Sequence, residues 1–267
     1  MAKIEQHYAP ASLTLVLNAA EGLLQIVLAA ETGRVLCAQD WDAPVRSTEI
    51  LAPALRQILQ GLALSPQHVG RIACVKGPGS YTGIRQTLAT AAALSRVVGA
   101  SMAGLDYMQA LALTAGQNQA YHAGQPLWVL THARRDMVHW QRFVWQGSAP
   151  RALAPVQLAS PAEVAAQVQQ SPVPPVLTGS GLARNAAAFA GLACPQALAP
   201  SFAPSHAALL ALAAQAHYGH SDIEPLYVRP CDAVDNLPRM AERQGICPEE
   251  AQHTLASLLA VKPASFI

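Results

Sequence analysis

The chain has 267 residues, of which 52% are hydrophobic and 12% are charged, and its formal net charge is +1. This composition predicts a folded protein with a substantial core, in one large domain or two ordinary ones. The near-neutral charge excludes the basic excess that is typical of an autonomous nucleic-acid binder. The apolar run at residues 13–17 is short and polar residues follow it, so we expect no targeting or membrane segment and a cytoplasmic protein.

The chain opens with three predicted strands and a helix. Apolar runs at residues 13–17, 23–29 and 34–38 are separated by turn residues, which predicts a three-stranded meander. A helix is predicted from Ser47 to about residue 59, because its apolar side chains recur on one face. These apolar side chains are Ile50, Leu51, Ala54, Leu55, Ile58 and Leu59.

A glycine-rich turn joins a predicted strand at residues 71–75 to a predicted helix at 82–98. Its glycines permit backbone angles that are closed to other residues, and Ser80 or Thr82 can cap the helix. The turn fits either a structural strand-to-helix connection or an anion site at a helix N-terminus. It is not a P-loop, because no Lys-Ser or Lys-Thr pair follows the last glycine. The residues of this candidate site are Gly77, Gly79, Ser80, Thr82, Gly83 and Arg85.

A second set of elements follows Gly104. We predict helices at residues 106–114 and 206–217, a helix that begins with a capping box at Ser160, and a final helix at 248–261. Strands are predicted at 127–131, 137–144, 176–178 and 226–229. The strand at 176–178 ends in a second glycine turn, residues 179–181, which contains no acidic residue or lysine.

The residue sequence of the glycine turn identifies a family more specifically than the spacing of its glycines does. Gly-Pro-Gly-Ser-Tyr-Thr-Gly-Ile-Arg at residues 77–85 resembles the signature of the bacterial TsaB (YeaZ) family. Residues 104–112, 133–139 and 225–229 resemble later motifs of that family in the same order. The resemblance covers roughly residues 13–229. It implies an α/β fold with two actin-like (RNase H-like) domains, each a mixed sheet flanked by helices.

The resemblance also implies the domain limits, the function and the partners. We expect an N-terminal actin-like domain at residues 1–104, a C-terminal one at 105–229 and a tail of unknown function at 230–267. The family takes part in threonylcarbamoyl transfer to N6 of adenosine 37 in tRNA. The implied partners are a TsaD-like catalytic subunit and a TsaE-like ATPase, with a homodimer as a further assembly and tRNA contacted only through the complex. No intrinsic cofactor is expected, although ATP or ADP could bind at the interface with TsaD.

The chain departs from the family pattern in the first turn, at residue 46, and at His132, which stands where relatives usually carry Asp. The first turn in proteins of this class carries Asp followed by Thr or Ser for phosphate and metal, whereas this chain has Asn18, Ala19 and Ala20. Arg46 stands where relatives have a His before the serine that opens the first helix. The first departure removes a carboxylate and two hydroxyls, so nucleotide chemistry in this half is disfavoured.

We expect no catalytic residue and no metal site. The nine histidines include no His-x-x-x-His, the motif that holds the metal in TsaD, and Ser80 has no base evident in the sequence. The five cysteines are widely spaced, which argues against a zinc knuckle. An accessory subunit is therefore favoured over the alternative, a stand-alone ATP-dependent transferase or peptidase of the actin-like fold.

A partner interface is predicted over the helices at 47–59 and 82–98. These helices are expected to pack side by side, and they carry more apolar side chains than one sheet can cover. The family resemblance implies the same region for self-association and for pairing with TsaD. The predicted interface residues are Ile50, Leu51, Leu55, Ile58, Ile84 and Leu88.

Overall fold

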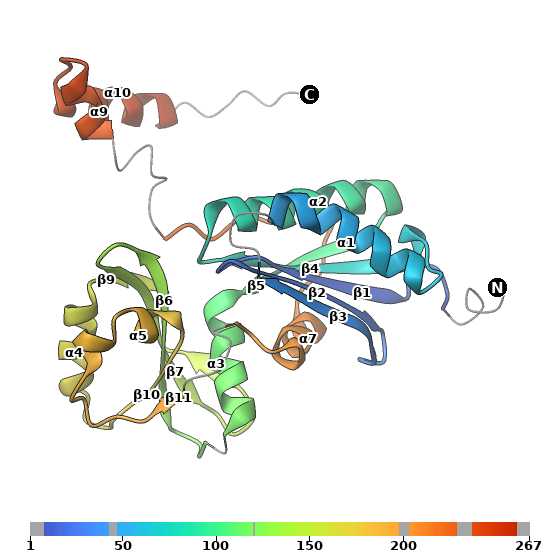
Figure 1. Ribbon diagram of the computed structural model, residues 1–267, viewed down its shortest axis with the longest axis horizontal. Helices are drawn as coiled ribbons and strands as arrows, with labels where there is room; N and C mark the ends of the chain where they lie inside the picture. The colour runs from blue at the N-terminus through green and yellow to red at the C-terminus, as the bar shows by residue number, and fades with distance from the viewer. Residues whose placement is uncertain (1–7, 43–46, 120, 198–202, 229–236, 261–267) are drawn as a thin grey trace. The chain divides into compact units, whose positions relative to one another are not determined.

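The computed structural model describes residues 8–42, 47–119, 121–197, 203–228 and 237–260. It divides into two compact units, residues 1–228 and 229–267. The first unit contains two mixed β-sheets flanked by helices, and the second contains a pair of helices (Figure 1). The predicted α/β class with two mixed sheets is confirmed.

The first sheet has five strands in the order β3-β2-β1-β4-β5. The strands are β1 (Leu13–Asn18), β2 (Leu23–Ala30), β3 (Val35–Asp42), β4 (Val69–Gly77) and β5 (Ser101–Asp106). The first three form the predicted antiparallel meander, whereas β4 pairs in parallel with both β1 and β5. Successive side chains of a strand point to opposite faces, so Leu15 and Leu17 belong to one apolar layer and Val16 to another.

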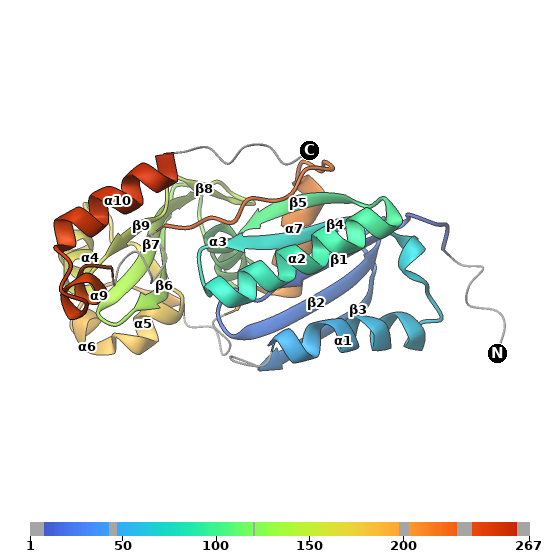
Figure 2. The same cartoon turned by 90° about the horizontal axis from the view of Figure 1, so that it is seen from above.

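Helices cover both faces of this sheet. On one face lie α1 (Ser47–Gly61) and α2 (Tyr81–Val98), as Figures 1 and 2 show. Leu51 of α1 and Ala91 of α2 pack into the apolar layer with Leu15. A short 3-10 helix, η2 (Pro66–His68), precedes β4, and α7 (His206–Gln215) packs on β1 and β5 from the other face.

The second sheet has the order β11-β10-β6-β7-β8, with β9 also paired to β7. Its strands are β6 (Pro126–Arg134), β7 (Met137–Trp145), β8 (Pro150–Ala152), β9 (Gln157–Ala159), β10 (Val176–Thr178) and β11 (Gln196–Ala197). Its helices are α4 (Pro161–Gln169), α5 (Ser180–Arg184) and α6 (Ala186–Phe189). The capping box at Ser160 is confirmed, because its backbone N–H donates to the Glu163 carboxylate at 2.7 Å.

One helix, α3 (Tyr107–Asn118), lies between the two sheets. Its buried residues Met108 and Leu111 share one continuous apolar core with Val75 of the first sheet and Phe143 of the second. Packing on this helix therefore joins the sheets into a single unit. The first sheet spans residues 13–106 and the second 126–197, while the division into domains 1–104 and 105–229 stays a prediction.

The predicted strand at residues 226–229 is wrong for its described part. Residues 226–228 form no strand, although the Leu226 backbone N–H donates to the Lys76 carbonyl oxygen of β4 at 2.7 Å. Residue 229 and Arg46, the second departure from the family pattern, lie outside the described residues.

The second unit contains α9 (Leu237–Arg243) and α10 (Pro248–Ala260). The final helix was predicted at nearly these bounds, whereas α9 was not predicted. The two helices contact each other, and Ala241 is buried between them and the turn that joins them. Within the described residues of either unit, no helix is both long enough and apolar enough to cross a membrane.

Candidate functional site

The glycine turn packs directly on the turn between β1 and β2. The backbone N–H of Ser80 donates to the carbonyl of Ala20 at 2.6 Å. A Cβ atom at Gly79 would lie 2.3 Å from that same oxygen, and one at Gly83 would lie 2.1 Å from the oxygen of Ala19. Both glycines are therefore required for a close approach between two backbones.

Ser80, and not Thr82, caps α2. The Ser80 hydroxyl accepts a hydrogen bond from the backbone N–H of Gly83 at 3.2 Å, while Thr82 is exposed. The N–H of Ser80 is already bonded to Ala20, so one of the donors that an anion would need is used within the chain. These contacts favour the structural interpretation of the turn, and anion binding there stays a prediction.

The two most distant parts of the family signature meet at this turn. Leu226 bonds to the strand that enters the turn, and a Cβ atom at Gly77, where φ is +119°, would lie 2.8 Å from the Leu226 carbonyl oxygen. Tyr227 stacks on Tyr81 with ring centroids 5.4 Å apart. Arg85 donates from Nε to the Tyr227 hydroxyl at 2.8 Å, and its guanidinium lies 4.3 Å from the centroid of the Tyr81 ring. Residues 77–85 and 225–228 thus form one packed structure.

The first turn is built around an amide instead of a carboxylate. Asn18 is buried, its Nδ2 donates to Gln25 at 2.8 Å, and its Oδ1 accepts from the N–H of Ala20 at 3.0 Å. Both ends of the side chain are therefore engaged inside the protein. Asn18 holds the shape of the turn on which the glycine turn rests.

Glu21, in the same turn, reaches the second sheet. Its carboxylate accepts hydrogen bonds from the Ser180 hydroxyl at 2.5 Å, the His132 backbone N–H at 3.1 Å and the Tyr107 hydroxyl at 3.1 Å. Burial raises the pKa of the Glu21 carboxyl, although the three hydrogen bonds and the charge of Arg184 act in the opposite direction. The sequence did not identify Glu21, because its partners lie as far as 159 residues away.

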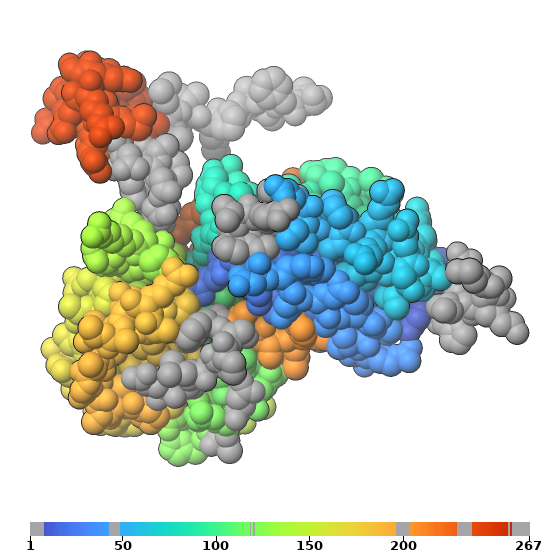
Figure 3. All heavy atoms as spheres, viewed as in Figure 1, coloured from blue at the N-terminus to red at the C-terminus, as the bar shows by residue number. Residues whose placement is uncertain are grey.

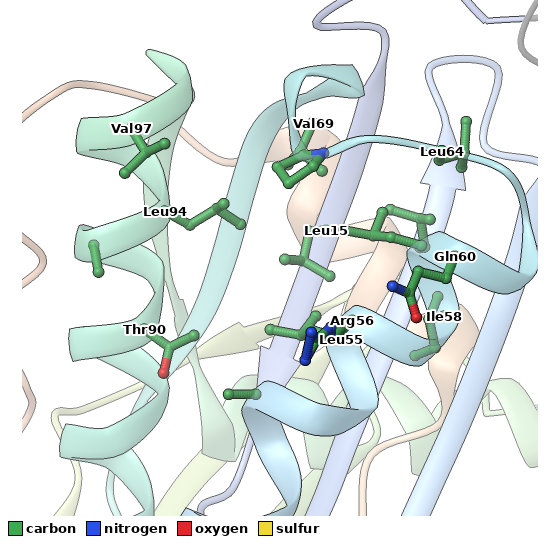
Figure 4. Close-up of a pocket in the computed structure, with 15 residues that line it drawn as sticks. Leu15, Leu55, Arg56, Ile58, Gln60, Leu64, Val69, Thr90, Leu94 and Val97 are labelled. Carbon is green, nitrogen blue, oxygen red and sulfur yellow. The ribbon is translucent and has the colours of Figure 1, made fainter.

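An apolar groove lies between α1 and α2, and its volume is about 490 Å³. Leu15 of β1 and Leu28 of β2 form its floor. Leu94 and Val97 point into it from α2, and Figure 4 shows Leu55 on the opposite wall. Val97 is 76% exposed, which is unusual for an aliphatic side chain, and α1 forms part of the outer surface in Figure 3. The groove is therefore an apolar depression that opens to solvent.

The predicted interface residues fall into three groups in the structure. Leu55 and Ile58 line the groove, whereas Ile50 and Leu88 are half-buried beside it. Leu51 is only 1% exposed and belongs to the core under α1. Ile84 is also 1% exposed and lies in the core shared by the two sheets, so a partner could not reach it. The Ile84 side chain faces inward beside the glycine turn, whereas Tyr81, Thr82 and Arg85 of the same turn of α2 are exposed.

The sequence contained a signal for the groove residues that were missed. Thr90, Ala93, Leu94 and Val97 recur at i, i+3, i+4 and i+7, which places them on one face of α2. Ala52, Leu55, Arg56 and Leu59 follow the same spacing on α1. These two sets mark the walls of the groove, although the set on α1 overlaps the apolar stripe that predicted this helix only at Leu55 and Leu59.

Among the residues that the structure describes, no cluster of three or more His, Cys, Asp or Glu side chains could hold a metal ion. The hairpin between β6 and β7 carries Arg135 and Asp136, whose side chains are 95% and 90% exposed.

Cys74 is buried in β4, and burial raises the pKa of its thiol. The thiol is thus held in its neutral, unreactive form.

A family model described as TsaD, tRNA N6-adenosine threonylcarbamoyltransferase, matches residues 42–230, which is more than half of the chain. The chain belongs to the TsaD family. No curated protein matches the sequence. Two solved structures from Pseudomonas aeruginosa share the fold of this TsaD-family chain. One is a protein with similarity to peptidase YEAZ, with 23% identity and a TM-score of 0.68, covering 82% of this chain and 100% of its own.

The other solved structure is YeaZ from Pseudomonas aeruginosa, with 22% identity and a TM-score of 0.66. The match covers 81% of this chain and 99% of the YeaZ chain. The TsaD family match and the fold shared with these two structures agree with the predicted resemblance to the TsaB (YeaZ) family, and they confirm the predicted fold of two mixed sheets flanked by helices.

Proposed function

We propose that this chain is the non-catalytic partner subunit in threonylcarbamoyl transfer to N6 of adenosine 37 in tRNA. In this proposal it docks a TsaD-like catalytic subunit in the groove between α1 and α2, and a TsaE-like ATPase joins the pair. The tRNA is held by the complex, and ATP or ADP binds at the interface with the catalytic subunit. The membership of a tRNA-modification family supports the pathway.

The groove is the observation that carries this proposal. Its lining is mostly apolar, with Arg56, Gln60 and Thr90 as its polar residues. Exposed apolar surface of this kind is typical of a protein interface. A neighbouring helix inserted between α1 and α2 would bury Val97 and Leu94 and would complete the layer above Leu15.

Two features support an accessory role over a stand-alone transferase or peptidase. In the first turn, the position of the phosphate-binding carboxylate is taken by Asn18, whose amide is engaged by Gln25 and Ala20. In the described part of the chain, no cluster of metal-binding side chains replaces it. A stand-alone transferase or peptidase would need a nucleophile, a general base or a set of metal ligands, and these two features supply none of them.

Substitution in the groove tests the proposal. Val97→Glu places a carboxylate on a residue that is already 76% exposed, so we expect the fold to persist. Against an apolar partner, the same carboxylate must lose its hydration. We therefore expect the affinity for the TsaD-like subunit, measured by calorimetry with both purified proteins, to fall at least about tenfold, which corresponds to about 1.4 kcal/mol. Ala93→Glu, on the same wall, should act in the same way.

Val173→Glu is the matched control, because Val173 is 51% exposed in the loop after α4 and does not line the groove. It should bind the TsaD-like subunit as the wild type does. Unchanged affinity for Val97→Glu and Ala93→Glu would contradict the groove as the docking site. Light scattering on the isolated chain tests for a homodimer. If the wild type forms a homodimer and these two variants do not, self-association uses the same surface.

A further inference from the structure

An irregular segment at residues 219–228 follows the edge of the first sheet, and we name it the strap. Gly219 forms two backbone hydrogen bonds with Met102 of β5, one in each direction, at 2.7 and 2.9 Å. Further along, the Leu226 backbone N–H donates to β4 at 2.7 Å. The strap is therefore attached at two points to the strands at this end of the sheet.

The strap lies on the face of the sheet that α1 and α2 cover. Its Ile223 side chain packs on the apolar layer that contains Leu51 of α1 and Ala91 of α2. A Cβ atom at Gly104 of β5 would lie 2.9 Å from the Ile223 side chain, so the strap passes close over the backbone of β5. In Figure 2, α2 lies between α1 on one side and the strap on the other.

The strap contacts α2 near both ends of the helix. Near the start, Tyr227 stacks on Tyr81, and its hydroxyl accepts a hydrogen bond from Arg85. In the last turn, Nη2 of Arg96 donates to both carboxylate oxygens of Asp222, each at 2.9 Å. The period of 3.6 residues places Tyr81, Arg85 and Arg96 on one face of α2. The strap therefore supports that face along most of the helix.

The groove wall of α2 lies on nearly the opposite side of the helix. Each residue advances about 100° around the axis, so the wall residues at positions 90, 93, 94 and 97 lie roughly 140° from the face that contacts the strap. A partner helix that enters between α1 and α2 would push α2 away from α1, toward the strap. Contacts on the far side of α2 oppose this displacement and thus help to set the width of the groove.

The contacts between the strap and α2 can break while the rest of the unit stays folded. The side chains of Arg96 and Asp222 are both 65% exposed, and exposed ion pairs contribute little to stability. Tyr81 and Tyr227 are exposed as well. Segments with exposed contacts and few buried apolar side chains open locally at a small cost in free energy. The strap thus has the features of a segment that exchanges between docked and detached states.

We propose that the strap is a positioning element for the partner subunit: docked along α2, it holds the groove wall at the separation from α1 that the partner requires. This inference rests on the proposed function, because the partner in the groove is the TsaD-like subunit. The partner binds molecules whose strap is docked, so its apparent affinity falls with the docked fraction. By linkage, the bound partner must in turn stabilise the docked strap. Asp222 and Tyr227 are positioning residues, since neither lines the groove.

Substitutions in the strap test the inference. The double variant Asp222→Ala/Tyr227→Ala removes both contacts with α2 at exposed positions, so the unit should stay folded. Its affinity for the TsaD-like subunit, measured by calorimetry, should fall about three- to tenfold. Asp222→Ala/Tyr227→Phe keeps the ring on Tyr81 and should recover part of this loss.

Glu224→Lys is the matched control, because Glu224 is an exposed residue of the strap that takes part in none of these contacts. Its affinity for the TsaD-like subunit should equal that of the wild type. This control separates positioning from direct contact, since a partner that touched the strap would respond to the reversed charge. Loss of affinity in Glu224→Lys would therefore overturn the inference.

Hydrogen exchange of the wild type is a second test, which decides the question if the double variant does not fold. Binding of the TsaD-like subunit should slow exchange of the Gly219 and Leu226 amides, which bond to β5 and β4 and do not line the groove. A strap that only stabilised the fold would not respond to the partner. The Gly124 amide, which bonds to Trp145 of the second sheet, should exchange at the same rate with and without the partner.

The outcomes separate the inference from the proposed function. Wild-type affinity in the double variant, or unchanged exchange of the Gly219 and Leu226 amides in the complex, would overturn the inference and leave the proposed function intact. Equal slowing of the Gly124 amide would also overturn it, because the effect would then be general. Absence of any binding between the wild type and the TsaD-like subunit would overturn the proposed function, and the inference with it.

Discussion

Gly83→Ala is the sharpest test of why the glycine turn has its composition. Gly83 lies in the first turn of α2, where alanine is ordinarily the better helix former by about 1 kcal/mol. A methyl group at this position, however, would lie 2.1 Å from the carbonyl oxygen of Ala19 and 3.2 Å from its Cβ atom. Helix propensity and packing thus predict opposite signs for the same substitution.

The magnitude follows from what must move. The oxygen that the methyl group meets belongs to the backbone of the first turn, and Ser80 and Ala20 tie the two turns together through a 2.6 Å hydrogen bond. Rotation of a side chain cannot relieve the contact, so the cost lies near the upper end of overpacking, about 3 kcal/mol. After the helix gain of about 1 kcal/mol, a net loss of about 2 kcal/mol is expected, which lowers the melting temperature by about 4–8 °C.

Circular dichroism melts and urea titrations of the purified chain measure this loss. The matched control is Gly61→Ala at the end of α1, because a Cβ atom there would have no neighbour within 4 Å. Its stability should rise by up to about 1 kcal/mol. The reasoning fails if Gly83→Ala melts at or above the wild type, as Gly61→Ala should, because the close approach of the two backbones would then be unimportant.

Three further changes extend these expectations. Gly79→Val should destabilise the first unit by about 1–3 kcal/mol in urea titrations, because its Cβ would lie 2.3 Å from the Ala20 oxygen and φ is +158°. Ser80→Ala should cost only about 1 kcal/mol in the same assay, the usual contribution of one helix cap. Burial raises the folded-state pKa of Glu21 above its ordinary value of 4.5, so its stabilising contribution is complete below pH 4.5 and is lost as the pH rises through the folded-state pKa. The melting temperature of the wild type should therefore fall relative to that of Glu21→Gln as the pH rises through the folded-state pKa. Parallel curves of melting temperature against pH for the two proteins would contradict this expectation.

Local patterns in the sequence predicted most of the fold. The apolar runs between turn residues predicted the meander, and the apolar stripe from Ile50 to Leu59 predicted α1, because period and burial are linked within one element. The strand expected at residues 226–229 failed because an apolar run carries no information on whether a neighbouring strand has a free edge. Its real contacts, with Lys76 and Arg85, come from a turn about 140 residues earlier in the chain.

The candidate site was less predictable than the fold, again because its contacts join residues that lie far apart in the sequence. Ile84 and Val97 are both aliphatic residues of α2, and only the placement of the helix on the sheet buries the first and exposes the second. Glu21 looked like an ordinary polar residue of a turn. Its partners His132 and Ser180 are 111 and 159 residues away, so no local pattern could connect them.

Helix α2 links the glycine turn to the groove, and this bears on how variants of either should be interpreted. Its first turn is fixed by the Ala19 and Ala20 carbonyls and by the stack of Tyr81, Arg85 and Tyr227. Further along, Thr90, Ala93, Leu94 and Val97 of the same helix form one wall of the groove. A substitution that displaces the start of α2 must therefore move that wall as well, because a helix transmits displacement along its axis as a rigid body. Loss of partner binding in a glycine variant follows from this geometry even without direct contact, whereas Val97→Glu leaves the turn intact and isolates the groove.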